Sequence, residues 1–569
     1  METAPRATPR SPAAIGLREL AAVVAGSLLL SVVMSWPLIW NLGSTIPLDL
    51  GDPLPQAWQV AWGGHALGTQ PFDYFQSNQF WPKPNTLAYS DALVGYAPSA
   101  LVGSGPTAAV ARYDLLFIGA YALCFAGTYL LARELGAGPG PAAVAGAAFA
   151  FAPWRMEQNG HLHVISSGGI PLALFFLARG SRARRPALVV AGWAVAAWQL
   201  SLGFSLGLIL AYLLATLAVV AGVVWMRAGR PRPSVRTVAA HAVGGALFAL
   251  VGYVLSRPYL AVVDQFPDAR RTVAQIEAFS GPPWMYLTAS GENMLWGGLT
   301  GPLRDSLKNV PEMTLFPGLA IVALAVAGLG ATAWPRRLRL GLGLGVLGTV
   351  LLTFGMHTQG GLLWPYRVLY EVLPGWQGMR TPGRLTTLVS LGLALLAALG
   401  AARLAGAVRE RGSGRAAGPL VAGVLCVAVL VEGAGFSVTP PAGPTQPQVP
   451  AAPVAFSDYA GPQLHLPALR AEDNRRYLLW STDGFPDLVN GRSSLNPESF
   501  FSLVERSRSF PDRDSVRALR AAGVRTVMLH RDRTAGTPWE RADRRPVRGL
   551  GVRRTRLDRV TIYGLGTGP

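Results

Sequence analysis

The chain has 569 residues, of which 50% are hydrophobic and only 14% are charged, and its mean hydropathy is +0.32. Soluble proteins carry about 25% charged residues, so this composition argues against an ordinary soluble domain and indicates apolar surface that faces lipid. The net charge of +19 does not indicate a nucleic-acid-binding protein, because the basic residues are nearly all arginines in short groups between apolar segments.

A transmembrane helix needs about 20 predominantly apolar residues, and about eleven segments are predicted to be spans on this basis. They are 17–40, 112–132, 138–153, 161–179, 186–203, 204–226, 237–256, 311–334, 338–356, 383–403 and 417–437. The first segment is longer than the apolar region of a signal peptide and ends in bulky residues, so it is predicted to be a retained helix. The sequence therefore predicts an all-α polytopic membrane domain.

Groups of arginines set the predicted orientation, because positively charged loops stay on the cytoplasmic side of a membrane. All of these groups are cytoplasmic only if the ambiguous stretch 92–110, which Pro98 and Pro106 interrupt, is interfacial or re-entrant. We therefore expect the N-terminus to be cytoplasmic. The use of arginine in place of lysine, with much alanine, glycine and proline, is associated with GC-rich bacterial genomes, so the expected location is a bacterial cytoplasmic membrane. The predicted outer segments are the loops 41–111, 154–160, 257–310 and 357–382 and the tail from about 438.

The composition changes after the last predicted span. Residues 1–437 are assigned to the membrane domain, 438–455 to a proline-rich linker, and 456–569 to a small extracytoplasmic α/β domain. Within this tail, the predicted strands are 476–480, 524–530 and 560–563, and the predicted helices are 500–506 and 513–522.

The first outer loop carries two carboxylates, Asp52 and Asp91, on either side of an aromatic stretch. Trp58, Trp62 and His65 are spaced to share one face of a short helix, and such a helix can lie in the membrane interface. Asp directly before a proline is also a good helix start. The spacing therefore leaves two roles open for the acids, helix capping and chemistry.

The second polar segment, 154–163, places Arg155, Glu157, Gln158 and His161 between apolar helices. Ionisable residues at membrane depth are costly and are candidates for function, although ordinary interfacial polarity is an alternative. A metal site formed by His161 and His163 with a carboxylate is a weaker hypothesis, since alternate residues of a helix point to different faces.

The third polar segment has Arg380 and Arg384 at the predicted outer end of a helix, where positive charge is not expected. Guanidinium groups bind phosphate oxygens in a bidentate manner. The pair is therefore a candidate phosphate site on the outer leaflet, with lipid headgroup contact or a helix-end ion pair as the alternative.

The chain resembles bacterial polytopic proteins of the GT-C glycosyltransferase superfamily. The resemblance is carried by Gly51-Asp52-Pro53 and the sequence Asn-Thr-Leu-Ala-Tyr-Ser-Asp ending at Asp91, by the two basic segments, and by motifs in the tail. The nearest groups are membrane proteins with a domain like that of lipopolysaccharide-core galacturonosyltransferases, and YfhO-like proteins.

The resemblance implies transfer of a sugar from a polyprenyl-phosphate donor to a lipid, glycan or protein acceptor. It makes Asp52 the catalytic base and Asp91 the second acid of the loop, and it leaves a divalent cation open as a cofactor. Some relatives have an Asp-Glu pair where this chain has Asp52 and Pro53, which puts the substrate in doubt. The predicted substrate- and phosphate-binding residues are Arg155, Glu157, Gln158, His161, Arg380, Arg384, Trp58 and Tyr89.

Two other functions stay open. A transporter or flippase for a lipid-linked intermediate would show internal repeats with broken helices at corresponding positions, and the sequence has no such repeat. A non-catalytic GT-C-like scaffold for envelope assembly is the third hypothesis, because a fold does not determine a function.

Overall fold

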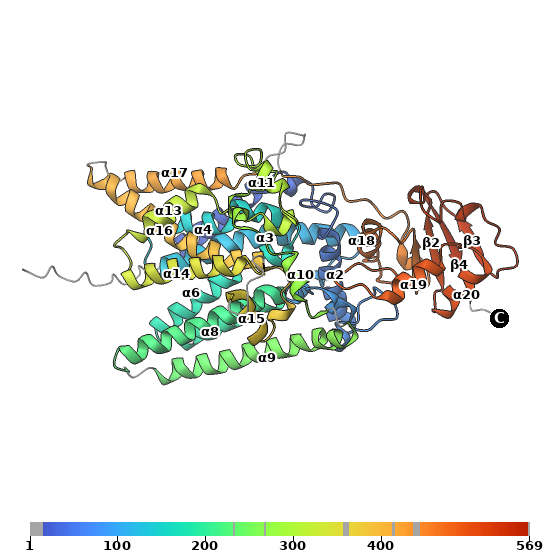
Figure 1. The fold of residues 1–569 in the computed structure, drawn as a ribbon, viewed down its shortest axis with the longest axis horizontal. Coiled ribbons are helices and arrows are strands. Elements are labelled where there is room, and N and C mark those ends of the chain that lie inside the picture. The colour runs from blue at the N-terminus through green and yellow to red at the C-terminus, as the bar shows by residue number, and fades with distance from the viewer. Residues whose placement is uncertain are drawn as a thin grey trace, which may run out of the picture. The chain divides into compact units, whose positions relative to one another are not determined.

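The computed structural model describes residues 15–230, 234–266, 269–356, 364–411, 416–435 and 444–566. The chain is mostly helical and divides into two compact units (Figure 1). The first unit contains Met1–Pro37, Phe117–Val254 and Arg270–Thr445, and the second contains Leu38–Leu116, Leu255–Ala269 and Gln446–Pro569. The predicted first loop and the tail therefore belong to one folded body. The predicted domain boundary at 437–438 lies outside the described residues.

Helices of very different length correspond to the predicted spans. Those of ten residues or more are α1 (Leu17–Met34), α3 (Gly105–Glu134), α4 (Pro139–Ala150), α6 (Gly169–Arg182), α7 (Pro186–Leu202), α8 (Phe204–Arg227), α9 (Val235–Gln265), α13 (Leu319–Leu329), α14 (Arg336–Thr353), α16 (Thr386–Glu410) and α17 (Ala417–Glu432). Short helices join them: α5 (Leu162–Ile165), α10 (Val273–Glu277), α11 (Gly301–Asp305), α12 (Val310–Met313) and α15 (Pro365–Val372).

Six of the helical segments in the described residues are long and apolar enough to cross a membrane. They are Leu17–Met34, Gly105–Glu134, Leu162–Arg182, Phe204–Arg227, Val235–Gln265 and Pro382–Glu410. The structure thus supports a multi-pass membrane protein, but the number of about eleven spans is not confirmed. The difference arises in helices such as α13, whose 11 residues rise only about 16 Å, whereas the hydrocarbon core is about 30 Å thick.

Helix α16 is the centre of the first unit. It packs against α4, α13, α14 and α17, and 83% of its most apolar window is buried, compared with 11% for α9. The contact between α13 and α16 is unusually close, because a Cβ on Gly400 would lie 2.0 Å from the Leu324 oxygen and a Cβ on Gly328 would lie 2.0 Å from the Leu396 oxygen. Small residues permit such backbone contact between membrane helices.

We expect Gly400→Ala to lower the thermal unfolding temperature of the purified protein in detergent, because the new methyl group forces α13 and α16 apart at a cost of about 1–3 kcal/mol. Gly406→Ala is the matched control on the same helix, since a Cβ added at Gly406 would have no other atom within 4 Å. Equal unfolding temperatures for the two variants would contradict the close packing.

The second unit contains a four-stranded sheet with the order β1-β2-β4-β3. Its strands are β1 (Gln463–Leu466), β2 (Thr526–His530), β3 (Arg553–Arg556) and β4 (Val560–Gly564), and its helices include α2 (Pro53–Thr69), α18 (Ala471–Trp480), α19 (Glu498–Arg506) and α20 (Arg513–Ala521). Strands β1 and β2 are parallel, and β4 is antiparallel to both β2 and β3.

The α/β character of the tail and four of its predicted elements, β2, β4, α19 and α20, are confirmed. The predicted strand 476–480 is wrong, because these residues form the second half of α18. A short, fully buried apolar run does not distinguish a strand from a helix by periodicity. Strands β1 and β3 were not predicted, and β3 carries three arginines in four residues.

The first loop and the tail form continuous backbone pairing within the second unit. Leu488 N–H donates to Asn78 O over 2.7 Å, Trp81 N–H to Leu488 O over 2.8 Å, and Phe80 N–H to Asn490 O over 3.2 Å. The Phe80 ring then packs into the same core as residues of the sheet. The tail residues are therefore part of the body that holds the first loop.

Two buried histidines stack in the core of the second unit. His465 Nδ1 lies 3.1 Å from His530 Nε2, and His465 Nε2 lies 3.1 Å from Gln463 Oε1. Because the Gln463 amide nitrogen already donates to Phe456 O, its oxygen accepts from His465, which leaves His465 Nδ1 to accept from His530. His530 Nδ1 is then a buried lone pair with no hydrogen-bond partner among the described residues.

Protonation of this pair is unfavourable in the folded state. Burial lowers the pKa of His530 to about 3, with the positive charge of Arg533 contributing. Burial and the neighbouring His530 also lower the pKa of His465. Unfolded histidine titrates near 6.5, so below that pH the unfolded state binds more protons than the folded state.

We therefore expect the second unit to lose stability as pH falls from about 6.5 toward 3, by roughly 1.4 kcal/mol per pH unit for each histidine that stays neutral when folded. Hydrogen–deuterium exchange of peptides covering β1 and β2, corrected for intrinsic rates, would measure this between pH 7 and pH 5. His530→Phe should make the dependence shallower, and an unchanged slope would contradict the assignment.

Candidate functional site

Asp52 stands immediately before α2, in the second unit. Its backbone is already helical, with φ −65° and ψ −26°, and its side chain makes no capping hydrogen bond. The capping interpretation of Asp52 is therefore not supported. The carboxylate is instead 53% exposed and lies 3.5 Å from a guanidinium nitrogen of Arg475 on α18. The Asp52 side chain is therefore largely exposed and lies beside a positive charge of the tail.

Asp91 has different surroundings in the same unit. It lies within electrostatic range of Tyr259, whose hydroxyl is hydrogen-bonded to the backbone of Ala92. The preceding residue, Ser90, accepts a hydrogen bond of 2.7 Å from the Gln59 side chain. These contacts give Asp91 a defined position near α9. They do not test its role as the second acid, which stays a prediction.

The predicted aromatic face of α2 is buried in protein. Trp58 is 1% exposed, and its indole N–H donates to Asn78 Oδ1 over 3.0 Å. Trp62 donates to Tyr74 O and meets Phe485 edge-on. A helix with one aromatic face can pack against protein as well as against lipid, and here it covers tail residues. The interfacial placement of α2 is therefore not supported.

Tyr89 is also a core residue, and only 1% of its surface is exposed. Burial raises the pKa of its hydroxyl to about 12, so the phenol is neutral at physiological pH. Its ring packs against Phe80 and Phe266. The geometry gives Trp58 and Tyr89 structural roles, and their predicted contact with a sugar stays a prediction.

Arg155, in the first unit, is 1% exposed. Its guanidinium lies 4.5 Å from the Phe149 ring centroid and donates to Phe149 O over 2.6 Å and to Ser167 Oγ over 2.9 Å. These contacts join the end of α4 to the start of α6. They account for Arg155 as a structural residue, and a phosphate-binding role gains no support from them.

Four other predicted residues of the first unit gather around Glu312, which lies on α12. Arg384 donates to its carboxylate over 2.9 Å, and both Arg380 and His161 lie within electrostatic range of it. The Gln158 amide donates to Pro311 O over 2.5 Å, and its oxygen lies 3.1 Å from His161 Nδ1.

Close backbone contact holds this basic cluster together. A Cβ on Gly383 would lie 2.5 Å from the Glu312 backbone oxygen, so the turn before α16 approaches α12 directly. Burial would raise the pKa of the Glu312 carboxyl, but the charges of Arg384, His161 and Arg380 outweigh it and lower the pKa below its usual value. Glu312 is therefore ionised at neutral pH.

Glu157 lies in the same polar segment, in a less favourable environment for charge. Burial raises the pKa of its carboxyl, and the negative charge of Glu292 adds to this, while a hydrogen bond with Ser290 and the charge of Arg304 oppose it. The shift favours the protonated form of Glu157 more than in a free glutamate side chain. Its role stays a prediction.

No group of three or more His, Cys, Asp and Glu residues that could hold a metal ion occurs in the part of the chain that the structure describes. The rings of His161 and His163 lie 5.8 Å apart at an interplanar angle of 76°. The divalent cation that the sequence left open is not assigned to any residues here.

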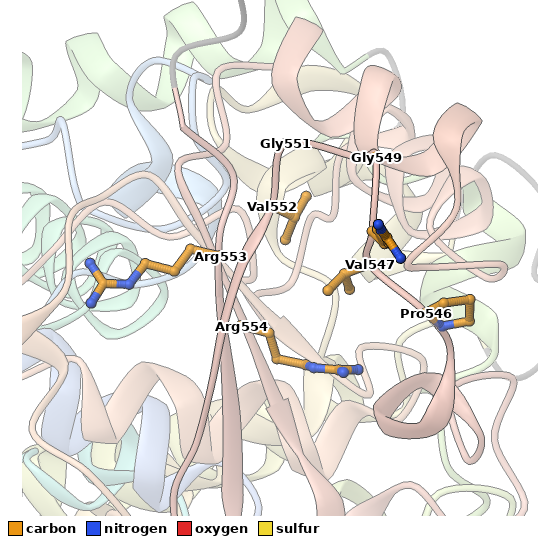
Figure 2. A pocket seen from close by; sticks show the side chains of 8 residues that line it. Pro546, Val547, Gly549, Gly551, Val552, Arg553 and Arg554 are labelled. Carbon is orange, nitrogen blue, oxygen red and sulfur yellow. The ribbon is translucent and has the colours of Figure 1, made fainter.

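A surface pocket of the second unit is formed by one segment, 546–554 (Figure 2). Figure 2 shows the Arg553 and Arg554 side chains extending to opposite sides of the strand. Arg554 donates to Asp543 O and Arg545 O over 3.1 and 2.9 Å, which anchors the segment. None of the predicted site residues lines this pocket, so it is separate from the candidate site.

No family model and no curated protein matches the chain. Among solved structures, it is similar to the arabinofuranosyltransferase AftD from Mycobacteria, with TM-scores of 0.58 and 0.56 and identities of 18% and 17% for two cryo-EM classes of a mutant. Each match covers 98% of this chain and 42% of AftD. The chain has the GT-C fold. It spans less than half the length of AftD.

Two further solved structures match more weakly and do not enter the assignment. The oligosaccharyltransferase of Archaeoglobus fulgidus matches with a TM-score of 0.44 at 15% identity, covering 90% of this chain and 68% of that one. ArnT from Cupriavidus metallidurans matches with a TM-score of 0.37 at 14% identity, covering 98% of this chain and 100% of that one. The GT-C fold assignment depends on the match to AftD.

Three charged residues were not predicted as site residues. Glu312 begins a predicted span, and an acid at the start of an apolar segment was a signal for it. Arg475 belongs to a run that was predicted to precede a strand, and Arg492 follows a buried strand-like segment. Neither arginine carries a local motif, because only the tertiary structure brings them to Asp52.

We expect Arg384→Met to lower the unfolding temperature in detergent by the equivalent of about 3–5 kcal/mol, since it leaves the buried Glu312 carboxylate without its main counter-charge. The double variant Glu312→Leu/Arg384→Met should recover a large part of this loss, because no unpaired charge remains buried. A double variant no more stable than the single one would contradict the pairing.

Proposed function

We propose that the chain is a membrane glycosyltransferase that moves a sugar from a polyprenyl-phosphate donor to an envelope lipid, glycan or protein acceptor. The proposal places this reaction on the outer face of a bacterial cytoplasmic membrane. The main support is the GT-C fold shared with AftD over 98% of the chain, together with an exposed and oriented Asp52 at the start of α2. Because the chain spans 42% of AftD, the donor sugar and the acceptor are not taken from AftD.

Asp52 acts as the general base in this proposal. Its carboxylate takes the proton from an acceptor hydroxyl, and the acceptor oxygen forms a bond to the anomeric carbon of the donor sugar. The bond from that carbon to the phosphate oxygen breaks, and the lipid phosphate leaves with the electron pair. Attack from the face opposite the phosphate inverts the anomeric centre. A positioned base contributes about 10²–10⁴-fold to such a step.

Arg380 and Arg384 of the first unit are, in this proposal, the candidates for binding a phosphate group of the substrate. The Arg380 guanidinium lies 4.4 Å from the Phe279 ring centroid, and Arg384 is held by Glu312. Guanidinium groups that are fixed before the reaction stabilise developing phosphate charge with little reorganisation. Gln158 and His161, which reach the same cluster, orient it. Asp91 and Glu157 are the reserve candidates for proton transfer.

We expect Asp52→Asn to reduce transfer of radiolabelled sugar from polyprenyl-phosphate donors in membranes by at least about 10²-fold, because an amide cannot accept the proton. Asp73→Asn is the matched control, since Asp73 is an exposed acid of the same predicted loop. Protein levels are compared by immunoblot in all membranes.

Transfer that is unchanged by Asp52→Asn would remove Asp52 as base and move attention to Asp91 and Glu157. No transfer by the wild type from a broad donor panel would count against the enzyme and favour a flippase or an envelope scaffold. Flipping of a fluorescent lipid-phosphate analogue in proteoliposomes separates these two.

A further inference from the structure

The tail places two arginines beside the acid of the first loop. Helix α18 packs against α2 and directs Arg475 to within 3.5 Å of Asp52. Arg492 comes from a separate tail segment and lies within electrostatic range of both Arg475 and Asp52. All three residues belong to the second unit, so their arrangement is a property of one folded body.

Buried hydrogen bonds fix the backbone that carries both arginines. Asn490 accepts from His465 N–H over 2.7 Å and donates to His465 O and to Asn474 Oδ1, each over 2.9 Å. Asn474 precedes Arg475 on α18 and donates to Ala468 O over 2.8 Å. One amide thus connects the helix of Arg475 to the segment of Arg492, which limits how far the two guanidinium groups can separate.

Gly491, the residue before Arg492, is also fixed by close contacts. A Cβ on Gly491 would lie 2.7 Å from three atoms of the Phe80 ring, and Phe80 N–H donates to Asn490 O. The first loop therefore closes on the backbone next to Arg492.

The charges of this cluster do not balance. Arg475 and Arg492 carry two positive charges, and Asp52 carries one negative charge. Arg475 has Asp52 as its ion-pair partner, whereas no hydrogen bond or ion pair of the Arg492 guanidinium occurs within the described residues. Arg492 is half-buried, and burial, together with the charge of Arg475, lowers its pKa. Holding two cations together in partial burial costs free energy unless an anion joins them.

We propose that Arg475, Arg492 and Asp52 form a substrate site in which Arg475 positions the Asp52 carboxylate and Arg492 binds an oxyanion, a phosphate group of the donor or of the acceptor. A guanidinium group binds phosphate through two parallel hydrogen bonds. The substrate identity rests on the proposed function, and the binding of the anion does not require transfer. The tail thereby contributes directly to this site of the second unit.

Binding is tested by isothermal titration of the purified full-length protein in nanodiscs with two probes, decyl phosphate and inorganic phosphate. Arg492→Gln should weaken binding about tenfold or more, because it removes charge-assisted hydrogen bonds to the anion. Arg492→Lys should lose less binding affinity, since lysine keeps the positive charge but lacks the two parallel N–H groups of the guanidinium. Arg513→Gln, at an exposed position on α20, is the matched control.

Asp52→Asn separates this inference from the proposed function. If the site binds an oxyanion, removing the negative charge should tighten phosphate binding while transfer is lost. Tighter binding with unchanged transfer would support the anion site and contradict Asp52 as base. Unchanged binding in both Arg492 variants, for both probes, would overturn the inference.

The two probes also identify the source of the anion. Dependence on Arg492 for decyl phosphate alone supports the lipid-linked donor as the ligand. Dependence for inorganic phosphate as well supports a site that takes a soluble phosphate group of the acceptor. Arg475→Gln should shift the acidic limb of the pH–transfer profile upward, because it removes the positive charge that favours ionised Asp52.

Discussion

One buried amide, Asn490, determines the geometry around the acid of the first loop. Its side chain is completely buried and hydrogen-bonds both backbone groups of His465 on β1 and the side chain of Asn474 on α18. The backbone carbonyl of Asn490 accepts a hydrogen bond from Phe80 N–H. The strand, the helix and the loop are therefore fixed relative to each other by one residue. Buried amides whose groups are satisfied specify a unique arrangement, because any other arrangement leaves polar groups without partners.

The buried acid Glu312 has the corresponding effect in the first unit. Arg384 supplies its counter-charge, and the backbone contact at Gly383 keeps α12 against the turn that precedes α16. The central helix of the unit thus begins at an ion pair that is buried within protein. In both candidate regions a buried polar group, Asn490 in the second unit and Glu312 in the first, orders the charged side chains around it.

The sequence predicted the class of the protein better than its details. Hydropathy and arginine placement identified a helical membrane domain, and turn signals identified β2 and the helices α19 and α20 in the tail. The segment 476–480 was assigned to a strand because four buried residues in succession have no period. The number of about eleven spans is not confirmed, because apolar composition continues through α4 and α13, whose 12 and 11 residues are shorter than a spanning helix. Where a helix begins and ends depends on tertiary packing, and a hydropathy profile carries no information about that packing.

The candidate site shows the same division. Local sequence selected the Arg380 and Arg384 segment and the 154–163 segment, and the structure brings parts of both to Glu312. Arg475 and Arg492 were not selected, because they are distant in sequence from Asp52 and lie in polar stretches that resemble ordinary surface. Trp58 and Arg155 were selected for their chemistry, yet the fold buries them. Residue type identifies what can react, whereas burial decides what is accessible.

Strand β3 has a consequence for how copies of this protein behave toward each other. It forms one edge of the sheet and carries Arg553, Arg554 and Arg556, two of them exposed. An open sheet edge is a template for pairing with another strand, and charged side chains on the edge oppose such pairing. The arginines therefore disfavour pairing of this edge with a strand from another copy of the protein.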